Sequence, residues 1–264
     1  MTRIIAVANQ KGGVGKTTTC VNLAAALADM RHSVLLVDLD PQANATVGCG
    51  INPRELEWST LEVLLGECNA SDAIVELESS SAHLLPATVD LTAAEVSLVD
   101  SDHREQTLAT VLRPVAANYR YVIIDCPPSL NMLTLNALTA ADSVLIPIQC
   151  EYYALEGLTA LLNTIEQVQE RINPQLKIEG LLRTMFDIRN NLSGEVSRQL
   201  TEYFGEKVYR TMVPRNVRLA EAPSHGLPVI RYDPSSRGAV AYLGLAGELI
   251  RRENTPRIKM GSQS

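Results

Sequence analysis

The sequence lacks any uninterrupted run of about 18–20 apolar residues, the length that a membrane-spanning helix needs. Its N-terminus, MTRIIAVANQKGG, passes from a short apolar stretch directly into glycines, without the small-residue cleavage site of a secretory signal. These two absences predict a cytoplasmic protein. Charge is also sparse, at 20% of residues, whereas 46% of residues are hydrophobic. This composition over 264 residues excludes a disordered or fibrous protein and suits one large or two small globular domains.

Cysteine is scarce as well: the chain has five, widely spaced, with no CxxC and no Cys/His pair at metal-ligand spacing. An odd, scattered set argues against a disulfide framework and against a structural zinc site. The chain also lacks the cluster motif expected of a reductase that shares an iron–sulfur cluster between subunits. We therefore expect buried free thiols at Cys20, Cys49, Cys68, Cys126 and Cys150.

Charge of the two signs is unevenly distributed along the chain. The formal net charge of −7 argues at first against nucleic acid as a partner, because phosphate backbones attract basic surfaces. Residues 1–180, however, hold 10 Lys/Arg against 22 Asp/Glu, whereas residues 181–264 hold 13 against 8. This asymmetry hints at an interaction surface in the C-terminal third, although scattered solvated charges would give the same counts.

Short β-branched-rich runs alternate with longer alanine- and leucine-rich segments of helical period. The runs that we predict to be buried parallel strands are 3–9, 33–39, 119–126, 143–149 and 176–186. The segments that we predict to be helices are 16–30, 104–117, 131–141, 153–172, 192–204 and 238–252. Region 44–103 is less regular, and we expect it to hold short helices and a further strand at 83–87. The pattern predicts an α/β fold with a doubly wound, mostly parallel sheet and helices on both faces.

No Gly/Ser linker, internal repeat or low-complexity block interrupts this alternation, so we expect residues 1–254 to form a single domain. The last residues, 255–264, are polar and contain the helix-breaking Pro256. We therefore expect a disordered tail there. The tail also has too few bulky apolar residues for an amphipathic helix that would anchor the protein to a membrane.

A glycine-rich loop, NQKGGVGKTTTC, follows the first predicted strand. Its glycines permit backbone conformations and close approaches that a Cβ would block. With a helix beginning near Lys16, the amides of the loop and of the helix N-terminus would form a concave anion site. Lys16 could then reach the β and γ phosphates of a nucleotide, and the Thr17 hydroxyl could ligate Mg²⁺. The residues predicted to bind the nucleotide here are Gly12, Gly13, Val14, Gly15, Lys16, Thr17 and Thr18.

A dinucleotide-binding loop and a glycine turn without a ligand are the alternatives for this segment. The dinucleotide fingerprint GxGxxG, counted from Gly13 and Gly15, would need a glycine where the chain has Thr18. The GKT triplet also serves phosphate and metal, which a nicotinamide site does not require, so a nucleoside triphosphate is favoured. The standard GxxxxGKT pattern is nevertheless not met, because Gln10 replaces its first glycine and Lys11 precedes the glycine pair.

Three aspartates end predicted strands, at the sheet edge where open α/β folds bind ligands. Asp38 and Asp40 end the run VLLVDLD and should point to the same side, and Asp125 ends YVIID. Carboxylates beside a phosphate loop suit the placement of metal and water, so Asp125 fits a residue that holds Mg²⁺ through a water. Asp40 could contact the metal through a water too. The alternative is that these aspartates only form turns at the strand ends.

The segment KGGVGKTT resembles the deviant Walker A signature of the ParA/MinD superfamily of P-loop ATPases. The resemblance continues through DCPPSLNMLTLNAL, PIQCEYYALEGL, LLRTMFDIRNNLS and PRNVRLAEAPSHG, and so covers nearly the whole chain. It is to the small, chromosome-type, Soj-like partition ATPases. It implies that Lys11 reaches across an ATP-bound dimer to the partner's nucleotide, and that Asp40 positions the attacking water with support from Asp38. Pro214 and Asn216 are implied to border the adenine.

The resemblance also implies a function and partners. Such ATPases hydrolyse ATP slowly with Mg²⁺, form a homodimer when ATP-bound and bind double-stranded DNA without sequence preference. A ParB-like protein stimulates their hydrolysis during chromosome or plasmid segregation, and they associate with the nucleoid. Arg189 and Arg218 are the implied DNA contacts; the alternative is that they pair with Asp187 or Glu221 as ordinary surface ions. The residues implied to carry catalysis are Lys11, Lys16 and Asp40.

Three other functions share this type of loop and remain open at this point. A MinD-like ATPase would bind and leave a membrane instead of DNA. An amidoligase of the same superfamily would use ATP in synthesis. A ParA-like protein could position a cargo other than a chromosome or plasmid, and the sequence does not separate this possibility from partition.

Overall fold

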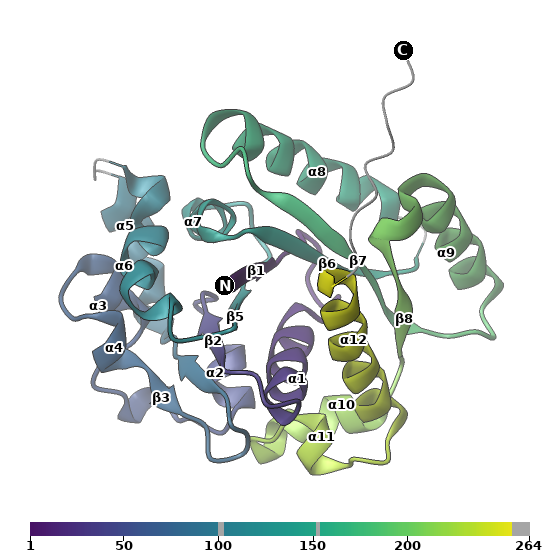
Figure 1. Cartoon of the computed structure of the whole chain (residues 1–264), viewed down its shortest axis with the longest axis horizontal. Coiled ribbons are helices and arrows are strands. Elements are labelled where there is room, and N and C mark those ends of the chain that lie inside the picture. The colour runs from purple at the N-terminus through teal and green to yellow at the C-terminus, as the bar shows by residue number, and fades with distance from the viewer. Residues whose placement is uncertain (100–102, 152–153, 255–264) are drawn as a thin grey trace.

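An eight-stranded sheet runs through the middle of the molecule in the computed structural model, which describes residues 1–99, 103–151 and 154–254 (Figure 1). The strand order is β3-β4-β2-β5-β1-β6-β7-β8. Among the described strand pairs, β3 and β4 are antiparallel and the others are parallel. The strands are β1 (Arg3–Val7), β2 (Val34–Asp38), β3 (Val75–Glu76), β4 (His83–Leu85), β5 (Tyr121–Asp125), β6 (Ser143–Gln149), β7 (Lys177–Phe186) and β8 (Val208–Pro214).

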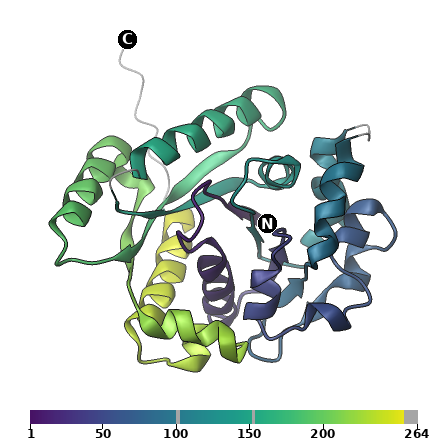
Figure 2. The same ribbon diagram turned by 180° about the vertical axis from the view of Figure 1, so that it is seen from behind.

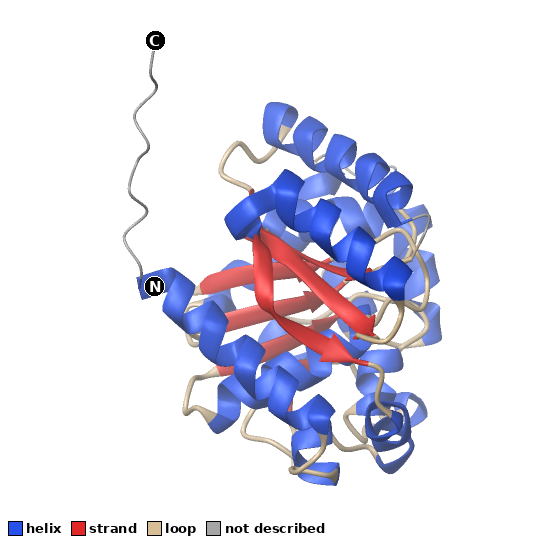
Figure 3. Cartoon of the chain, turned by 90° about the vertical axis from the view of Figure 1, so that its right-hand side faces the viewer, coloured by secondary structure: helices blue, strands red, loops and turns tan. Residues whose placement is uncertain are grey.

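Helices cover both faces of this sheet, which the side view shows as a layer between them (Figure 3). One face is packed by α1 (Lys16–Asp29), α2 (Asn44–Gly48), α11 (Val229–Tyr232) and α12 (Arg237–Asn254). The opposite face is packed by α3 (Thr60–Leu65), α4 (Ala70–Ala73), α5 (Thr92–Val99), α6 (Thr107–Ala116), α7 (Met132–Ala140), α8 (Ala154–Arg171) and α9 (Asn191–Phe204). The view from behind in Figure 2 again shows helices on both sides of the sheet. The short helix α10 (Val217–Glu221) follows β8. The predicted doubly wound α/β fold is therefore confirmed.

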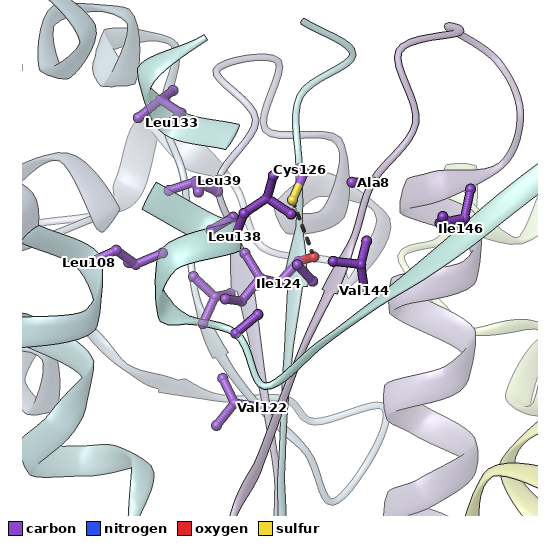
Figure 4. Packing of buried hydrophobic residues seen from close by; sticks show 14 of the residues in the cluster. Ala8, Leu39, Leu108, Val122, Ile124, Cys126, Leu133, Leu138, Val144 and Ile146 are labelled. Atoms are coloured by element: carbon purple, nitrogen blue, oxygen red, sulfur yellow. Dashed lines mark hydrogen bonds between the residues drawn. The ribbon is translucent and has the colours of Figure 1, made fainter. Parts of the chain in front are cut away.

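Alternating side chains of each strand supply the two halves of the hydrophobic core. In β1, Ile5 packs with α1 and α12, whereas Ala6 packs on the side of α7 and α8. Figure 4 shows Val122 and Ile124 of β5 on this second side, together with Leu138 of α7. Because both faces of a parallel sheet are covered, nearly every strand residue can be apolar. This is why the central strands are visible in the sequence as continuous apolar runs.

The predicted strands and helices are confirmed to within a few residues at their ends, and the short strand predicted at 83–87 is β4. Two strands were not predicted, β3 and β8. The segment of β8, VYRTMVP, buries Val208, Tyr209 and Val213 but exposes Arg210 and Met212, so it lacks a continuous apolar run. This pattern fits its place at the sheet edge. The predicted tail, 255–264, lies outside the residues that the structure describes.

All five cysteines are free thiols. The expectation that they are buried is confirmed at Cys20, Cys49, Cys126 and Cys150, but Cys68 is partly exposed because it lies in the connection between α3 and α4. Within the described part of the chain, no helix combines the length and the apolar character needed to cross a bilayer.

Candidate nucleotide and metal site

The glycine-rich loop connects the end of β1 to the start of α1. Gly13 and Gly15 have φ values of +73° and +88°, in the left-handed region that glycine adopts without steric cost. Gly15 is the N-cap of α1, which begins at Lys16, and the amide of Thr19 donates to the Gly15 carbonyl at 2.9 Å. The strand, loop and helix order required for a phosphate loop is therefore present, and the first amides of such a helix have no partner within the helix itself.

Two polar residues that the sequence analysis did not single out hold this loop against the neighbouring strands. The Asn9 side-chain amide donates to the Pro147 carbonyl of β6 at 2.7 Å, and its carbonyl accepts from the Lys11 amide at 3.0 Å. The Thr184 hydroxyl of β7 donates to the Val14 carbonyl at 2.7 Å. Both side chains are buried. The loop conformation is thus fixed from outside the motif, across 138 and 170 residues of sequence.

The two lysines of the loop have different environments. Lys16 is 7% exposed, and its ammonium lies 3.4 Å from the Lys11 carbonyl, folded back over the loop. Lys11 is much more exposed, and its ammonium forms an ion pair with Glu151 at 2.6 Å, just beyond β6. Lys16 is therefore placed to act on a ligand within its own loop, whereas Lys11 lies at the surface of the same sheet edge.

The aspartates lie at the carboxyl ends of adjacent strands. Val7, the last residue of β1, is in register with Asp125, and Asp125 is in register with Asp38. The structure thus brings Asp38, Asp40 and Asp125 to the edge from which the loop leaves, as the sequence analysis predicted. All three are buried, with at most 7% of the residue exposed.

Asp38 holds this group of residues in place, because both of its carboxylate oxygens accept hydrogen bonds. It accepts from the Thr46 amide at 2.8 Å, from the Thr46 hydroxyl at 2.7 Å and from the Asp40 amide at 3.2 Å. The Thr46 hydroxyl also accepts from the Ala87 amide at 2.9 Å. Asp38 therefore ties α2 and the backbone of Asp40 to the end of β2. The family resemblance implied only a supporting role for Asp38, and no role was predicted for Thr46.

Asp125 has a buried carboxylate oxygen without a hydrogen-bond partner, the feature of this site that most strongly indicates a bound cation. Its Oδ1 accepts from the Cys20 thiol at 3.4 Å, whereas its Oδ2 is buried without a hydrogen-bond partner. Burial, and then the neighbouring charge of Asp38, raise the pKa of Asp125, and the nearby Thr17 hydroxyl lowers this pKa in part. A carboxylate in this position is costly unless it is paired. The residues at this edge therefore fit a divalent cation held by Thr17 and, through water, by Asp125.

The described residues contain no group of three or more His, Cys, Asp or Glu side chains arranged to hold a metal ion. A Mg²⁺ ion keeps several waters and is usually held by one or two protein ligands together with nucleotide phosphates. Asp40 has a different arrangement: its Oδ1 accepts from the Gln42 amide at 3.0 Å, and its carbonyl accepts from the Ala43 amide at 2.8 Å. These bonds fix the carboxylate of Asp40 at the carboxyl edge of the sheet.

The remaining predicted site residues lie along the same edge, beyond β7 and β8. Pro214 ends β8 in register with Phe186, and Asn216 is the N-cap of α10, where it accepts from the Arg218 amide at 2.8 Å. Their contact with adenine stays a prediction. Arg189 pairs with Asp187 at 2.8 Å.

Arg218 pairs with Glu221 at 2.7 Å and with Asp233 at 3.3 Å. The surface ion pairs that the alternative interpretation expected are therefore present at Arg189 and at Arg218. Both arginine side chains are nevertheless more than half exposed, at 86% and 51%. A DNA contact by either arginine stays a prediction.

Comparison with known proteins identifies relatives that agree with a nucleotide site at this edge. A family model described as an AAA domain matches residues 2–178. The chain is 55% identical to the sporulation initiation inhibitor protein Soj of Bacillus subtilis, over 94% of this chain and 98% of that protein. It is 53% identical to the chromosome partitioning protein ParA of Myxococcus xanthus, over 97% of this chain and 90% of that protein.

Among solved structures, a protein from Mycobacterium smegmatis described as cobyrinic acid a,c-diamide synthase, with a bound ATP analogue and magnesium, matches with a TM-score of 0.86. It is 41% identical, over 97% of this chain and 98% of that chain. The loop, the carboxylates and these similarities agree. The chain belongs to the AAA-domain family and, within it, to the ParA/Soj family of chromosome-partitioning proteins.

Proposed function

We propose that this protein is a magnesium-dependent ATP hydrolase whose ATP-bound homodimer binds double-stranded DNA without sequence preference and drives chromosome or plasmid segregation. A ParB-like protein would stimulate its hydrolysis. The observation that carries the proposal is the buried, unpaired Oδ2 of Asp125 beside a phosphate loop with left-handed glycines. This arrangement has the groups that phosphoryl transfer requires, namely anion-binding amides, a lysine and a carboxylate for a cation. We take residues 1–254 as a single ATPase domain.

Each group at the edge has a distinct part in this proposal. The loop amides and the N-terminus of α1 bind the phosphates, and the Lys16 ammonium compensates their charge. When bound, Mg²⁺ neutralises the charge that develops on the phosphates, and Thr17 and Asp125 are the residues that would hold it. Asp40 orients the attacking water, because its backbone amide and carboxylate are fixed by Asp38 and Gln42. Phosphoryl transfer depends on such positioning and charge stabilisation, without a strong general base.

Dimerisation is the step in which Lys11 is proposed to act. Lys11 is exposed at the carboxyl edge, and its ion pair within the described residues is with the exposed Glu151. It could exchange this carboxylate for a phosphate of the opposite subunit. Exposed ion pairs contribute about 0–1 kcal/mol, so the exchange costs little. A cation that reaches a bound nucleotide from the partner explains why the dimer would need ATP.

Light scattering tests this step. We expect Asp40→Ala protein with ATP and Mg²⁺ to have the mass of a dimer, because it retains nucleotide but does not hydrolyse it. Adding Lys11→Ala should return the mass to that of a monomer, whereas Lys177→Ala, an exposed lysine at the amino end of β7, should leave the dimer intact. A Lys11→Ala protein that still dimerises with ATP would contradict the proposed role.

The charge distribution and the family support the proposed DNA binding. An acidic chain with a basic C-terminal third is a weak DNA ligand on its own. Pairing two copies roughly doubles the phosphate contacts, so affinity becomes coupled to the ATP-bound dimer. Hydrolysis would then release the protein from DNA. Repeated binding and release of nucleoid DNA in this way could move a chromosome or plasmid. The same cycle could also serve a ParA-like protein that positions another cargo.

The likeness to a protein described as a diamide synthase supports a second candidate, an ATP-dependent amide-forming enzyme. A glutamine-dependent enzyme of that kind would need a thiol with a lowered pKa as nucleophile. Here the pKa values of all five cysteines are raised, chiefly by burial. Hydrolysis of ATP in the absence of any carboxylic acid substrate separates the two candidates, and we expect slow hydrolysis that DNA and a ParB-like protein increase.

A further inference from the structure

A small basic cluster lies where β7 and β8 end, and it contains an arginine that the sequence analysis did not select. The turn Asp187–Asn190 follows β7, and the Asn190 amide donates to the Asp187 carbonyl at 3.0 Å. Arg215 follows β8, and its amide donates to the Phe186 carbonyl at 3.4 Å. Arg189 and Arg215 therefore project from neighbouring loops at the same edge as the phosphate loop.

Arg189 is held by Asp187 through three hydrogen bonds. The carboxylate of Asp187 accepts from the Arg189 amide at 3.0 Å, from Nε at 3.0 Å and from Nη2 at 2.8 Å. These bonds, together with the charges of Arg189 and Arg215, lower the pKa of Asp187 to about 2, so it is ionised at neutral pH. A guanidinium uses the same forked pair of donors to bind a phosphate. A DNA phosphate would therefore have to displace Asp187 to use the full fork of Arg189.

Arg215 differs from Arg189, because no carboxylate of the described residues binds its guanidinium. Its residue is exposed, and no hydrogen bond or ion pair is found for its guanidinium among the described residues. Its backbone amide lies 3.4 Å from the carbonyl of Phe186, the residue before Asp187, and its charge contributes to the lowered pKa of Asp187. Arg218, one turn further along the chain, is shared between Glu221 and Asp233. Of the arginines at this edge, Arg215 is thus the one whose charge is uncompensated by a direct partner in the described structure.

We infer that Arg215 supplies the leading phosphate contact at this edge, that is, the one that a DNA phosphate makes first, and that Asp187 masks Arg189. By a mask we mean that Asp187 competes with a DNA phosphate for the Arg189 guanidinium and so weakens DNA binding. The inference rests on the proposed DNA binding and adds to it. A phosphate attracted by Arg215 approaches the neighbouring Arg189–Asp187 pair, and exchanging one anion for another then completes the contact. Breaking one exposed ion pair lowers an equilibrium constant for binding by at most about a factor of five. A dimer has one Arg189–Asp187 pair in each subunit, so the two pairs together lower DNA affinity without abolishing it.

Two charge-changing variants test the inference in the full chain carrying Asp40→Ala, with ATP, Mg²⁺ and random-sequence duplex DNA at several salt concentrations. Asp187→Asn keeps an oxygen that can accept from the Arg189 amide but removes the competing charge, so we expect about two- to tenfold tighter binding. Asp29→Asn is its control, because it breaks another exposed pair, Asp29–Arg231 at 2.7 Å, with the same change in net charge.

Arg215→Ala should weaken binding and make the dependence of log affinity on log salt shallower by about two for a dimer, one for each lost contact. Arg113→Ala, an exposed arginine on α6, is its control and should change neither quantity. Each variant should retain the ATP-dependent dimer and the thermal stability of its parent.

The outcomes separate the inference from the proposed function. If the parent protein binds DNA with ATP but Asp187→Asn binds no more tightly than Asp29→Asn, the mask is wrong. If Arg215→Ala keeps the affinity and salt dependence of the parent, the leading contact lies elsewhere. If the parent binds no DNA in any nucleotide state, the proposed function fails and this inference falls with it.

Discussion

Lys16→Ala is expected to lose ATP hydrolysis by about 10²–10³-fold and to bind nucleotide much more weakly. Lys16 is nearly buried and folded back over its own loop, so its ammonium is already at the place where phosphates would bind. Alanine removes this charge but leaves Gly15, the N-cap and the first turn of α1 unchanged, so the fold should persist. Binding of a fluorescent ATP analogue and release of phosphate measure the two losses.

Lys177→Ala provides the control for this prediction, because it removes an exposed lysine from the opposite end of the sheet. It should bind and hydrolyse ATP as the parent does. Wild-type turnover by Lys16→Ala protein would show that the phosphates bind elsewhere and would contradict the site.

Asp125→Asn should have two opposite effects. We expect it to lose Mg²⁺-dependent hydrolysis by about 10²-fold or more, because an amide cannot replace the charge that holds the cation. In the absence of metal we expect it to be more stable than the parent, by on the order of 1 kcal/mol or more. Asp125 is fully buried beside Asp38 with one unpaired oxygen, and the neutral amide removes both the burial of charge and the repulsion.

The pH dependence gives this second prediction its sign. Burial raises the pKa values of Asp38 and Asp125 in the folded state above those of the unfolded chain. The folded state then binds more protons than the unfolded state, so metal-free protein loses stability as the pH rises from about 4 to about 8. The advantage of Asp125→Asn should therefore grow over the same interval and shrink when Mg²⁺ and nucleotide are added.

Urea unfolding at both ends of this interval, with and without Mg²⁺ and ADP, measures the effect. Asp90→Asn, on an exposed turn before α5, should behave as the parent throughout. An Asp125→Asn protein that is less stable than the parent at the higher pH, without metal, would show that the carboxylate is already compensated within the protein.

The parts of the fold that could be predicted from the sequence are those with a local signal. The central strands appear as apolar runs because they are covered on both faces, and Gly13 and Gly15 mark the loop because their backbone needs left-handed angles. The strand-end positions of Asp38 and Asp125 also follow from these runs. Strand β8 could not be predicted in this way, because an edge strand with exposed Arg210 and Met212 has no such run.

The parts of the site that could not be predicted depend on contacts between distant segments. Asn9 and Thr184 fix the loop by bonding to carbonyls that are far away in sequence, and neither residue belongs to a motif. Cys20 appeared to be only a buried thiol, yet it donates to one oxygen of Asp125, whose other oxygen is buried without a hydrogen-bond partner. The pairing of Arg189 with Asp187 could be anticipated, since only one residue lies between them in the sequence. The position of Arg215, for which the described residues provide no side-chain partner, required the register of β7 and β8.

The measurement that tests the central claim most directly is the binding of Asp40→Ala protein to random-sequence duplex DNA with ATP, with ADP and without nucleotide, at two salt concentrations. The account predicts tight, salt-sensitive binding with ATP alone, because only the ATP-bound dimer brings two basic surfaces together. Absence of DNA binding in every state, despite an ATP-dependent dimer by light scattering, would contradict it and would point to a membrane or a protein surface as the platform.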